Sequence, residues 1–171
     1  MTDASLTRVV LVRHAQSAVD PSTPPSTWGL TEEGRRRAAE LDLRGLRLLA
    51  GPEPKLIQTL EPHGVVDVDE RFAESHSEGW LGDDEFAATI ERYFAAPDRA
   101  PAPGWEPAAS VVERFDLVEG AAIASGGRAI AAVVAAHTGG DGLALWRSLR
   151  MPHVIVLDPR AGEGGWIAST P

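Results

Sequence analysis

Short apolar runs alternate along this chain with segments whose apolar residues recur at helical spacing. The runs at 8–12, 46–50, 65–68, 129–135, 154–157 and 165–168 predict β-strands. Helical spacing predicts helices at 31–41, 83–96, 109–124 and 141–149, with a further short helix that carries Lys55. Strands that alternate with helices are typical of an α/β fold, here a three-layer α/β/α sandwich with a mostly parallel central sheet.

The run at 129–135 is almost wholly apolar, which predicts a central strand that is covered on both faces and ends just before His137. The proline-rich segments 20–27 and 97–104 are predicted to be loops. Neither leaves enough chain on both sides to mark a domain boundary, so residues 1–171 are expected to form one domain.

Composition narrows the chemistry that the chain can perform. The 171 residues are 43% hydrophobic and 24% charged, as in ordinary globular proteins. The chain has no cysteine, which excludes disulfides, zinc–thiolate sites and cysteine nucleophiles. The first seven residues form no apolar leader, and no run approaches the roughly 20 apolar residues that span a bilayer. A cytoplasmic protein without a membrane partner is therefore expected.

The formal net charge of −9 argues against nucleic-acid binding, which needs a basic face. An anionic substrate would be repelled at long range, so any phosphate site has to be a local basic pocket. The basic cluster at 35–37 lies early in a predicted helix and is interpreted as a solvated face.

The strand predicted at 8–12 is followed directly by Arg13 and His14. Open α/β folds commonly bind their ligands at the carboxyl ends of strands. An arginine fork matches phosphate oxygens, and an imidazole can attack phosphorus. These residues alone fit a phosphoryl-transfer site as well as they fit a strand that simply ends in two polar side chains.

The remaining motifs favour the phosphoryl-transfer interpretation of Arg13 and His14. Arg13-His14, the helix start Leu30-Thr31-Glu32-Glu33-Gly34, Glu74, and His137-Thr138-Gly139-Gly140 occur in an order that resembles the histidine phosphatase superfamily, or phosphoglycerate mutase-like family. The resemblance covers residues 9–157. It implies a phosphoglycerate mutase-like fold and a metal-independent phosphohydrolase that forms a phosphohistidine and needs no cofactor.

The resemblance also implies a role for each matched residue. His14 would be phosphorylated during turnover, Glu74 would donate a proton to the leaving oxygen, and His137 would hydrogen-bond the same phosphoryl group. The residues expected to bind the substrate are Arg13, Ser17, Lys55 and Thr138. This hypothesis requires the imidazoles of His14 and His137 to meet around one oxyanion.

The chain departs from the family pattern at Lys55, which occupies the position of a second phosphate-binding arginine. Lysine keeps the positive charge but loses the bidentate fork, so activity or specificity can differ. The modest insert between Glu74 and His137 favours hydrolysis over mutase transfer, because water should reach the intermediate. The expected substrates are small phosphate monoesters or a phosphohistidine on a partner protein.

Three alternatives remain open. The chain can be a non-catalytic relative that binds a phosphorylated ligand or a protein, as Lys55 suggests, or a phosphoglycerate mutase. It can also be a metal-dependent hydrolase that uses His14, His76 and His137, although no recognised metal-ligand spacing occurs. The sequence predicts no oligomeric state.

Overall fold

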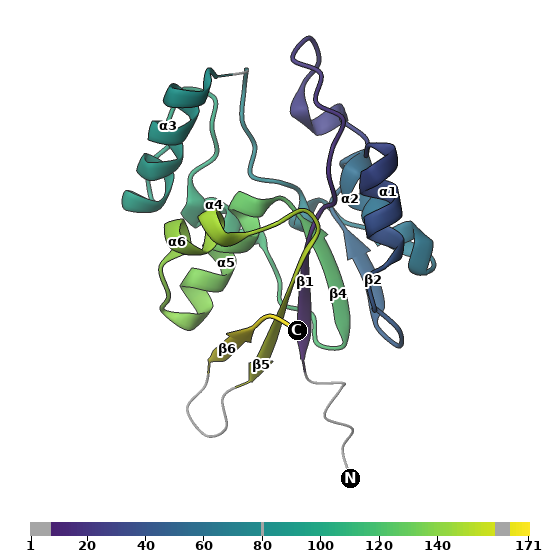
Figure 1. Cartoon of the computed structure of the whole chain (residues 1–171). Coiled ribbons are helices and arrows are strands. Elements are labelled where there is room, and N and C mark those ends of the chain that lie inside the picture. The colour runs from purple at the N-terminus through teal and green to yellow at the C-terminus, as the bar shows by residue number, and fades with distance from the viewer. Residues whose placement is uncertain (1–7, 80, 160–164) are drawn as a thin grey trace.

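The computed structural model describes residues 8–79, 81–159 and 165–171. Six strands form one mixed sheet in the order β3-β2-β4-β1-β5-β6 (Figure 1). Strands β1, β2, β3 and β4 are parallel, while β5 and β6 are antiparallel to their neighbours. The strand bounds are β1 Val9–Arg13, β2 Arg47–Ala50, β3 Val66–Val68, β4 Ala121–Ser125, β5 His153–Pro159 and β6 Trp166–Ser169.

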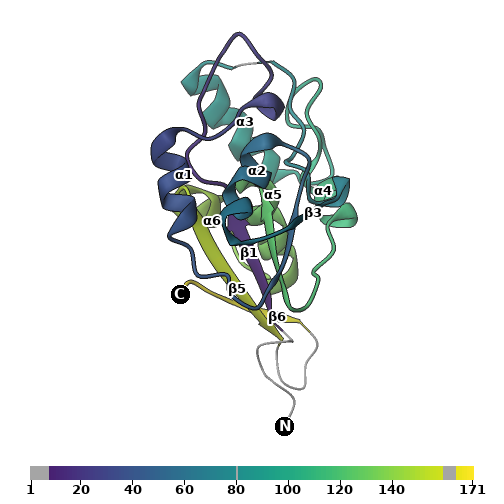
Figure 2. The same cartoon turned by 90° about the vertical axis from the view of Figure 1, so that its right-hand side faces the viewer.

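Helices cover both faces of the sheet, which confirms the three-layer α/β/α prediction. Helices α1 and α2 pack on one face, and α4, α5 and α6 pack on the other (Figures 1 and 2). The α-helices are α1 Glu32–Ala39, α2 Pro54–Leu60, α3 Asp83–Ala95, α4 Ala108–Arg114, α5 Gly127–Thr138 and α6 Gly142–Ser148. Short 3-10 turns are η2 Pro25–Thr27, η3 Glu61–His63 and η4 Glu70–Phe72.

Strand β1 shows how the sequence builds the two layers. Because successive side chains of a strand point to opposite faces, Val9 and Leu11 enter the core beneath α5, while Val10 and Val12 enter the core beneath α2. All four are at most 4% exposed. This strand is therefore fixed on both faces, and its carboxyl end is a rigid place from which to present Arg13 and the residue after it.

Two sequence predictions in the second half of the chain are wrong. The helix predicted at 109–124 ends at Arg114, and its last residues belong to β4. The strand predicted at 129–135 is instead the middle of α5. A continuous apolar run fits a buried strand as well as a buried helix, so its hydrophobicity alone does not decide between them. Alanine is the strongest helix former and supplies much of this segment, which favours the helix.

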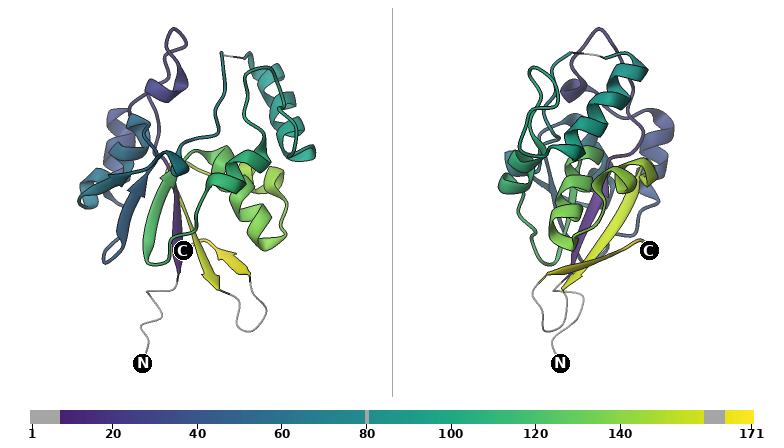
Figure 3. Two further views of the ribbon diagram at one scale, coloured as in Figure 1. Left: turned by 180° about the vertical axis from the view of Figure 1, so that it is seen from behind. Right: turned by 90° about the vertical axis from the view of Figure 1, so that its left-hand side faces the viewer.

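The other predicted elements are confirmed within a few residues. At the top of the molecule, the segment that carries η2 and the helix α3 rise on opposite sides above the carboxyl ends of the parallel strands (Figure 3). No helix in the described part of the chain is long and apolar enough to cross a membrane.

Candidate active site

The parallel strands bring the first candidate residues to one edge of the sheet. Arg13 and Ser125 are register partners at the carboxyl ends of β1 and β4. His14 follows β1 and is 6% exposed. Its ring nitrogen Nδ1 lies 2.7 Å from the carbonyl oxygen of Ala15. A carbonyl only accepts hydrogen bonds, so Nδ1 carries a proton, and Nε2 is the ring nitrogen that faces Glu74.

Glu74 lies between His14 and Lys55. Its Oε1 is 3.5 Å from Nε2 of His14, and its Oε2 is 2.6 Å from Nζ of Lys55. Burial opposes ionisation of this carboxyl, but the hydrogen bond to His14 and the attraction of Lys55 outweigh it and lower the pKa of Glu74 to about 2. The structure thus brings together three residues that the sequence analysis had singled out at separate places in the chain.

Lys55 is held firmly in this arrangement. It stands on the first turn of α2, is 3% exposed, and donates from Nζ to the carbonyl oxygen of Pro25 at 2.8 Å. The ammonium also lies 5.5 Å from the centroid of the Trp28 ring. A buried ammonium with these contacts places a fixed positive charge beside His14 and Glu74.

Helix α5 directs its amino terminus at the same place. A Cβ on Gly126 would lie 2.7 Å from Oε1 of Glu74, and one on Gly127 would lie 2.9 Å from Nε of Arg13. Only glycine allows these two close approaches. The partial positive charge of the helix N-terminus therefore lies near that of Lys55, and the Glu74 carboxylate is beside both.

Arg13 lies beside the site but is partly committed elsewhere. Its Nη1 donates to the carbonyl oxygen of Leu149 at 2.7 Å, and its Nε is buried without a hydrogen-bond partner among the described residues. Glu74 is close enough for its charge to act on Arg13. Arg13 thus supplies positive charge at the strand end that the sequence predicted.

The expected position of His137 is wrong. His137 and Thr138 are the last residues of α5, and Gly139 closes the helix with a φ of 73°. Since an α-helix rises 1.5 Å per residue, His137 lies about 15 Å along the axis from Gly127, which contacts Arg13. The imidazoles of His14 and His137 do not meet, and the two-imidazole hypothesis is withdrawn.

One predicted substrate-binding residue is also displaced from the site. Thr138, at the far end of α5, donates from Oγ1 to the carbonyl oxygen of Val134, within its own helix. Ser17 pairs with Leu30 in an isolated β-bridge, and its part in substrate binding stays a prediction. At the end of β4, the residue beside His14 is Ser125, which is fully buried and donates weakly to the carbonyl oxygen of Ala73 at 3.4 Å.

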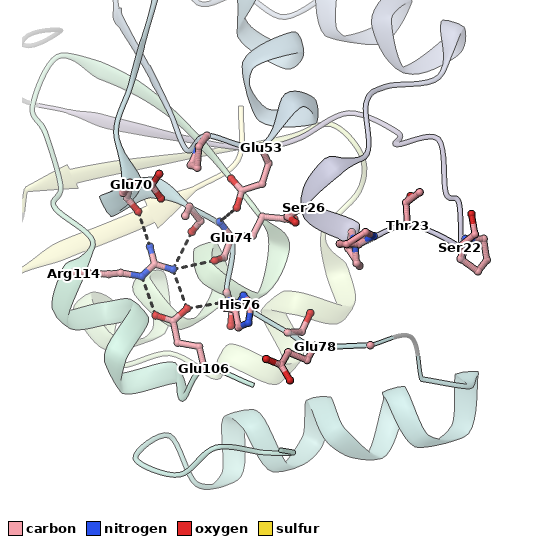
Figure 4. A pocket seen from close by; sticks show the side chains of 18 residues that line it. Ser22, Thr23, Ser26, Glu53, Glu70, Glu74, His76, Glu78, Glu106 and Arg114 are labelled. Atoms are coloured by element: carbon pink, nitrogen blue, oxygen red, sulfur yellow. Dashed lines mark hydrogen bonds and ion pairs between the residues drawn. The ribbon is translucent and has the colours of Figure 1, made fainter. Parts of the chain in front are cut away.

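A cavity of about 1080 Å³ opens in front of Glu74. One wall is the segment 21–26, and the other is the segment 73–79, as Figure 4 shows. Charged and histidine side chains in the lining are Glu53, Glu70, Glu74, His76, Glu78, Glu106 and Arg114. Lys55, which is 3% exposed, and the first residues of α5 do not line this cavity.

Arg114 is a structural residue of this cavity that the sequence analysis missed. Its Nε and Nη2 donate to Glu106 at 2.9 and 3.0 Å. Its Nη1 and Nη2 also donate to the carbonyl oxygens of Arg71, Ala73 and Glu74. The guanidinium therefore fixes the backbone that leads to Glu74 and has no donor left for a ligand.

Glu53 and Arg128 were missed as well. Arg128, on the first turn of α5, donates from Nη2 to the carbonyl oxygen of Ser75 and to the hydroxyl of Ser77. Glu53 is 7% exposed and accepts the backbone N–H of Glu74. Burial, with repulsion from Glu74, raises the pKa of Glu53 to about 7. No sequence pattern marks either residue, because both become buried only when distant segments pack together.

The ligand set expected for a metal-dependent hydrolase does not assemble. His76 is exposed at the cavity, and His137 is at the far end of α5 from His14. Within residues 8–79, 81–159 and 165–171, no three His, Asp or Glu side chains are grouped so that they could hold a metal ion.

No model of a known protein family matches the chain, and no curated protein sequence matches it. Many solved structures do match its fold. The structure of "Mycobacterial hydrolase 1" is 20% identical, with a TM-score of 0.72 over 96% of this chain and 97% of its own. A mycobacterial glucosyl-3-phosphoglycerate phosphatase is 21% identical, with a TM-score of 0.70 over the same shares. Bacillus stearothermophilus YhfR is 20% identical, with a TM-score of 0.72 over 96% of each chain. The chain thus has the fold of the histidine phosphatase superfamily.

Proposed function

We propose that this protein hydrolyses small phosphate monoesters through a phosphohistidine at His14, with Glu74 as the proton donor. The observation that carries the proposal is the position of the Glu74 carboxylate, an anion that contacts Nε2 of His14 and Nζ of Lys55 and lies beside Gly126 at the N-terminus of α5. A phosphoryl group fits the same donors. Phosphatases of the same fold, such as the mycobacterial enzyme, support this assignment.

The protons of the first step balance within the site. The proton on Nε2 of His14 first passes to Glu74, which is 3.5 Å away, so that Nε2 has a free lone pair. Nε2 then attacks phosphorus and the N–P bond forms, while the bond from phosphorus to the leaving oxygen breaks and Glu74 donates its proton to that oxygen. Water then attacks the phosphohistidine while Glu74 accepts a proton from it, the N–P bond breaks, and phosphate leaves.

Substrate binding itself prepares Glu74 to be an acid. In the free protein Lys55 lowers the pKa of Glu74. A phosphoryl dianion that takes Lys55 as its own partner removes that stabilisation and adds negative charge nearby, and both effects raise the pKa of the carboxyl. The Glu74 carboxylate has to move aside from Lys55 as the phosphoryl group enters.

Within the described residues no other imidazole contacts His14 or Glu74, which predicts a slow enzyme. We expect Lys55, Arg13 and the N-terminus of α5 to face the equatorial oxygens, since β4 ends in Ser125. Removal of a single oxyanion donor typically lowers kcat by roughly 10²- to 10³-fold. We therefore expect turnover well below that of sites with two histidines.

The same observation favours a second candidate function, namely binding of a phosphorylated ligand without turnover. A site with one imidazole and a lysine in place of an arginine keeps charge for binding but has fewer groups that stabilise a transition state. Such a protein would bind phosphate through Lys55 and would hydrolyse nothing.

The discriminating experiment compares the wild-type protein with His14→Ala, using 4-nitrophenyl phosphate for turnover and calorimetry for phosphate binding. Hydrolysis by the wild type that is lost in His14→Ala supports the enzyme. His76→Ala, which changes an exposed histidine of the same cavity, is the matched control. Phosphate binding by both proteins with turnover by neither overturns the hydrolase proposal and establishes the binding function.

A further inference from the structure

The first turn of α2 holds Glu74 at two points. Lys55 pairs with the carboxylate at 2.6 Å. Oε1 of Glu53 accepts the backbone N–H of Glu74 at 3.0 Å (Figure 4). Arg114 holds the carbonyl oxygen of the same residue from the opposite side at 3.0 Å. The position of Glu74 is therefore decided by groups from α2 and α4 rather than by its own segment, which has no regular secondary structure.

The side chain of Glu53 accepts hydrogen bonds from the backbone of Glu74 and from its own backbone. It is the N-cap residue of α2, but its side chain makes no capping hydrogen bond. The residue is 7% exposed, and Oε2 is buried without a hydrogen-bond partner among the described residues. A buried carboxyl with one oxygen unpaired is destabilising, so its presence needs an explanation other than stability.

Gly51 makes the room for this carboxyl. A Cβ on Gly51 would lie 2.7 Å from Oε2 of Glu53 and 2.6 Å from both the carbonyl oxygen of Phe72 and Cα of Ala73. Any side chain at position 51 would push Glu53 away from the backbone that leads into Glu74. Oε2 is buried and accepts no hydrogen bond from the described residues, and burial without a donor disfavours the ionised carboxyl.

We propose that Glu53 is a positioning residue for Glu74 and that it acts with its carboxyl protonated. The inference rests on the proposed role of Glu74 as the proton donor. In this form Oε1 still accepts the Glu74 N–H, and Oε2 carries a proton. Ionisation of Glu53 would place a second negative charge beside Glu74 and weaken the binding of an anion at Lys55.

Two charged groups act on Glu53. Glu74, from the segment 73–79, repels its ionised form, and Lys55, from α2, attracts it. Burial and the repulsion prevail, so the pKa of Glu53 rises to about 7, within the range that solution experiments cover easily. Ionisation of the Glu53 carboxyl can therefore be followed through the backbone N–H of Glu74, which donates to it.

The test follows the backbone amide of Glu74 by ¹H–¹⁵N NMR as the pH is raised. The wild type is expected to show an inflection of this amide near pH 7, and Glu53→Gln, which keeps the accepting oxygen but cannot ionise, is expected to lack it. Glu78→Gln, which removes an exposed carboxyl from the same cavity, should retain it. An amide without the inflection in the wild type, or with the same inflection in Glu53→Gln, overturns the proposal.

A second readout measures the affinity for sulfate, whose charge is constant over this range. Between pH 6 and 8 the sulfate affinity of the wild type should fall several-fold more than that of Glu53→Gln. The reason is that ionised Glu53 repels the bound anion, whereas glutamine stays neutral. An equal fall in the two proteins contradicts the inference. Neither readout needs turnover, so a wild type that hydrolyses nothing defeats the proposed function and leaves these measurements to decide on Glu53.

Steady-state kinetics distinguish a role of Glu53 in positioning Glu74 from a role in stabilising the fold. In Glu53→Ala the Glu74 N–H loses its acceptor, and kcat for 4-nitrophenyl phosphate should fall by roughly 10-fold or more, with little change in KM. Glu53→Gln should restore kcat at pH 6. Equal losses in both variants would contradict a role that depends on the accepting oxygen.

Discussion

Lys55 and Glu74 form an ion pair of 2.6 Å in which the lysine side chain is 3% exposed. In the free protein this pair occupies the proposed site, because the carboxylate lies where a phosphoryl group would bind. The free energy of the pair therefore affects both the stability of the protein and its affinity for phosphate.

Lys55→Met should lower the free energy of unfolding by about 3–5 kcal/mol, because it leaves Glu74 ionised and buried without its partner. It should also weaken phosphate binding. Urea denaturation and calorimetry measure the two effects, and Lys55→Arg, which keeps the charge, is the control. A methionine variant that binds phosphate as tightly as the wild type would exclude Lys55 from the anion site.

Gly126→Ala should lower kcat by roughly 100-fold, because the new Cβ would lie 2.7 Å from Oε1 of Glu74 and force the carboxylate away from His14. Steady-state kinetics with 4-nitrophenyl phosphate test this. Gly82→Ala is the matched control, since its Cβ meets nothing within 4 Å. Equal activity of the two variants would mean that Glu74 need not lie where the structure puts it.

His137→Ala should leave kcat within about twofold of the wild type, as expected for a substitution remote from the site. The measurement is steady-state turnover beside His14→Ala, in which activity should be lost. A loss in His137→Ala as large as that in His14→Ala would restore the two-imidazole hypothesis and contradict the position of α5.

The stability of the protein should depend on Glu53 in a defined direction. Its pKa in the folded protein, about 7, is above the ordinary value of 4.5. Below pH 4.5 both states hold the proton, and as the pH rises to 7 only the unfolded state loses it, so folding becomes less favourable. Relative to Glu53→Gln, the wild type should lose roughly 3 kcal/mol over this window. Urea titrations at several pH values measure the difference, and parallel curves would contradict it.

The sequence predicted much of the site because its residues follow strong local patterns. The apolar run of β1 ends in Arg13 and His14, and the spacing of Lys55 and Glu74 matches a known order of motifs. In the structure Glu74 contacts both His14 and Lys55, while the catalytic roles of the three residues stay predictions. Here a local pattern sufficed because a buried parallel strand fixes where its carboxyl end lies.

The error at His137 has an equally physical cause. Strand β4 is short and alanine-rich, which gives it a weak strand signal, and α5 is buried widely enough to lack a polar face. The two elements were therefore exchanged, and His137 was assigned to a strand end. Glu53 could not be found from sequence, since its burial arises only when Gly51 and the segment 72–74 pack together.

The proposed mechanism depends on a bond between phosphorus and His14 during turnover. The direct measurement is to mix the protein with ³²P-labelled monoester, quench it rapidly in base, and locate the label by digestion and mass spectrometry. The account predicts a base-stable, acid-labile phosphoryl group on His14, present in the wild type and absent from His14→Ala. Turnover without a labelled protein, or a label that persists in His14→Ala, would contradict it.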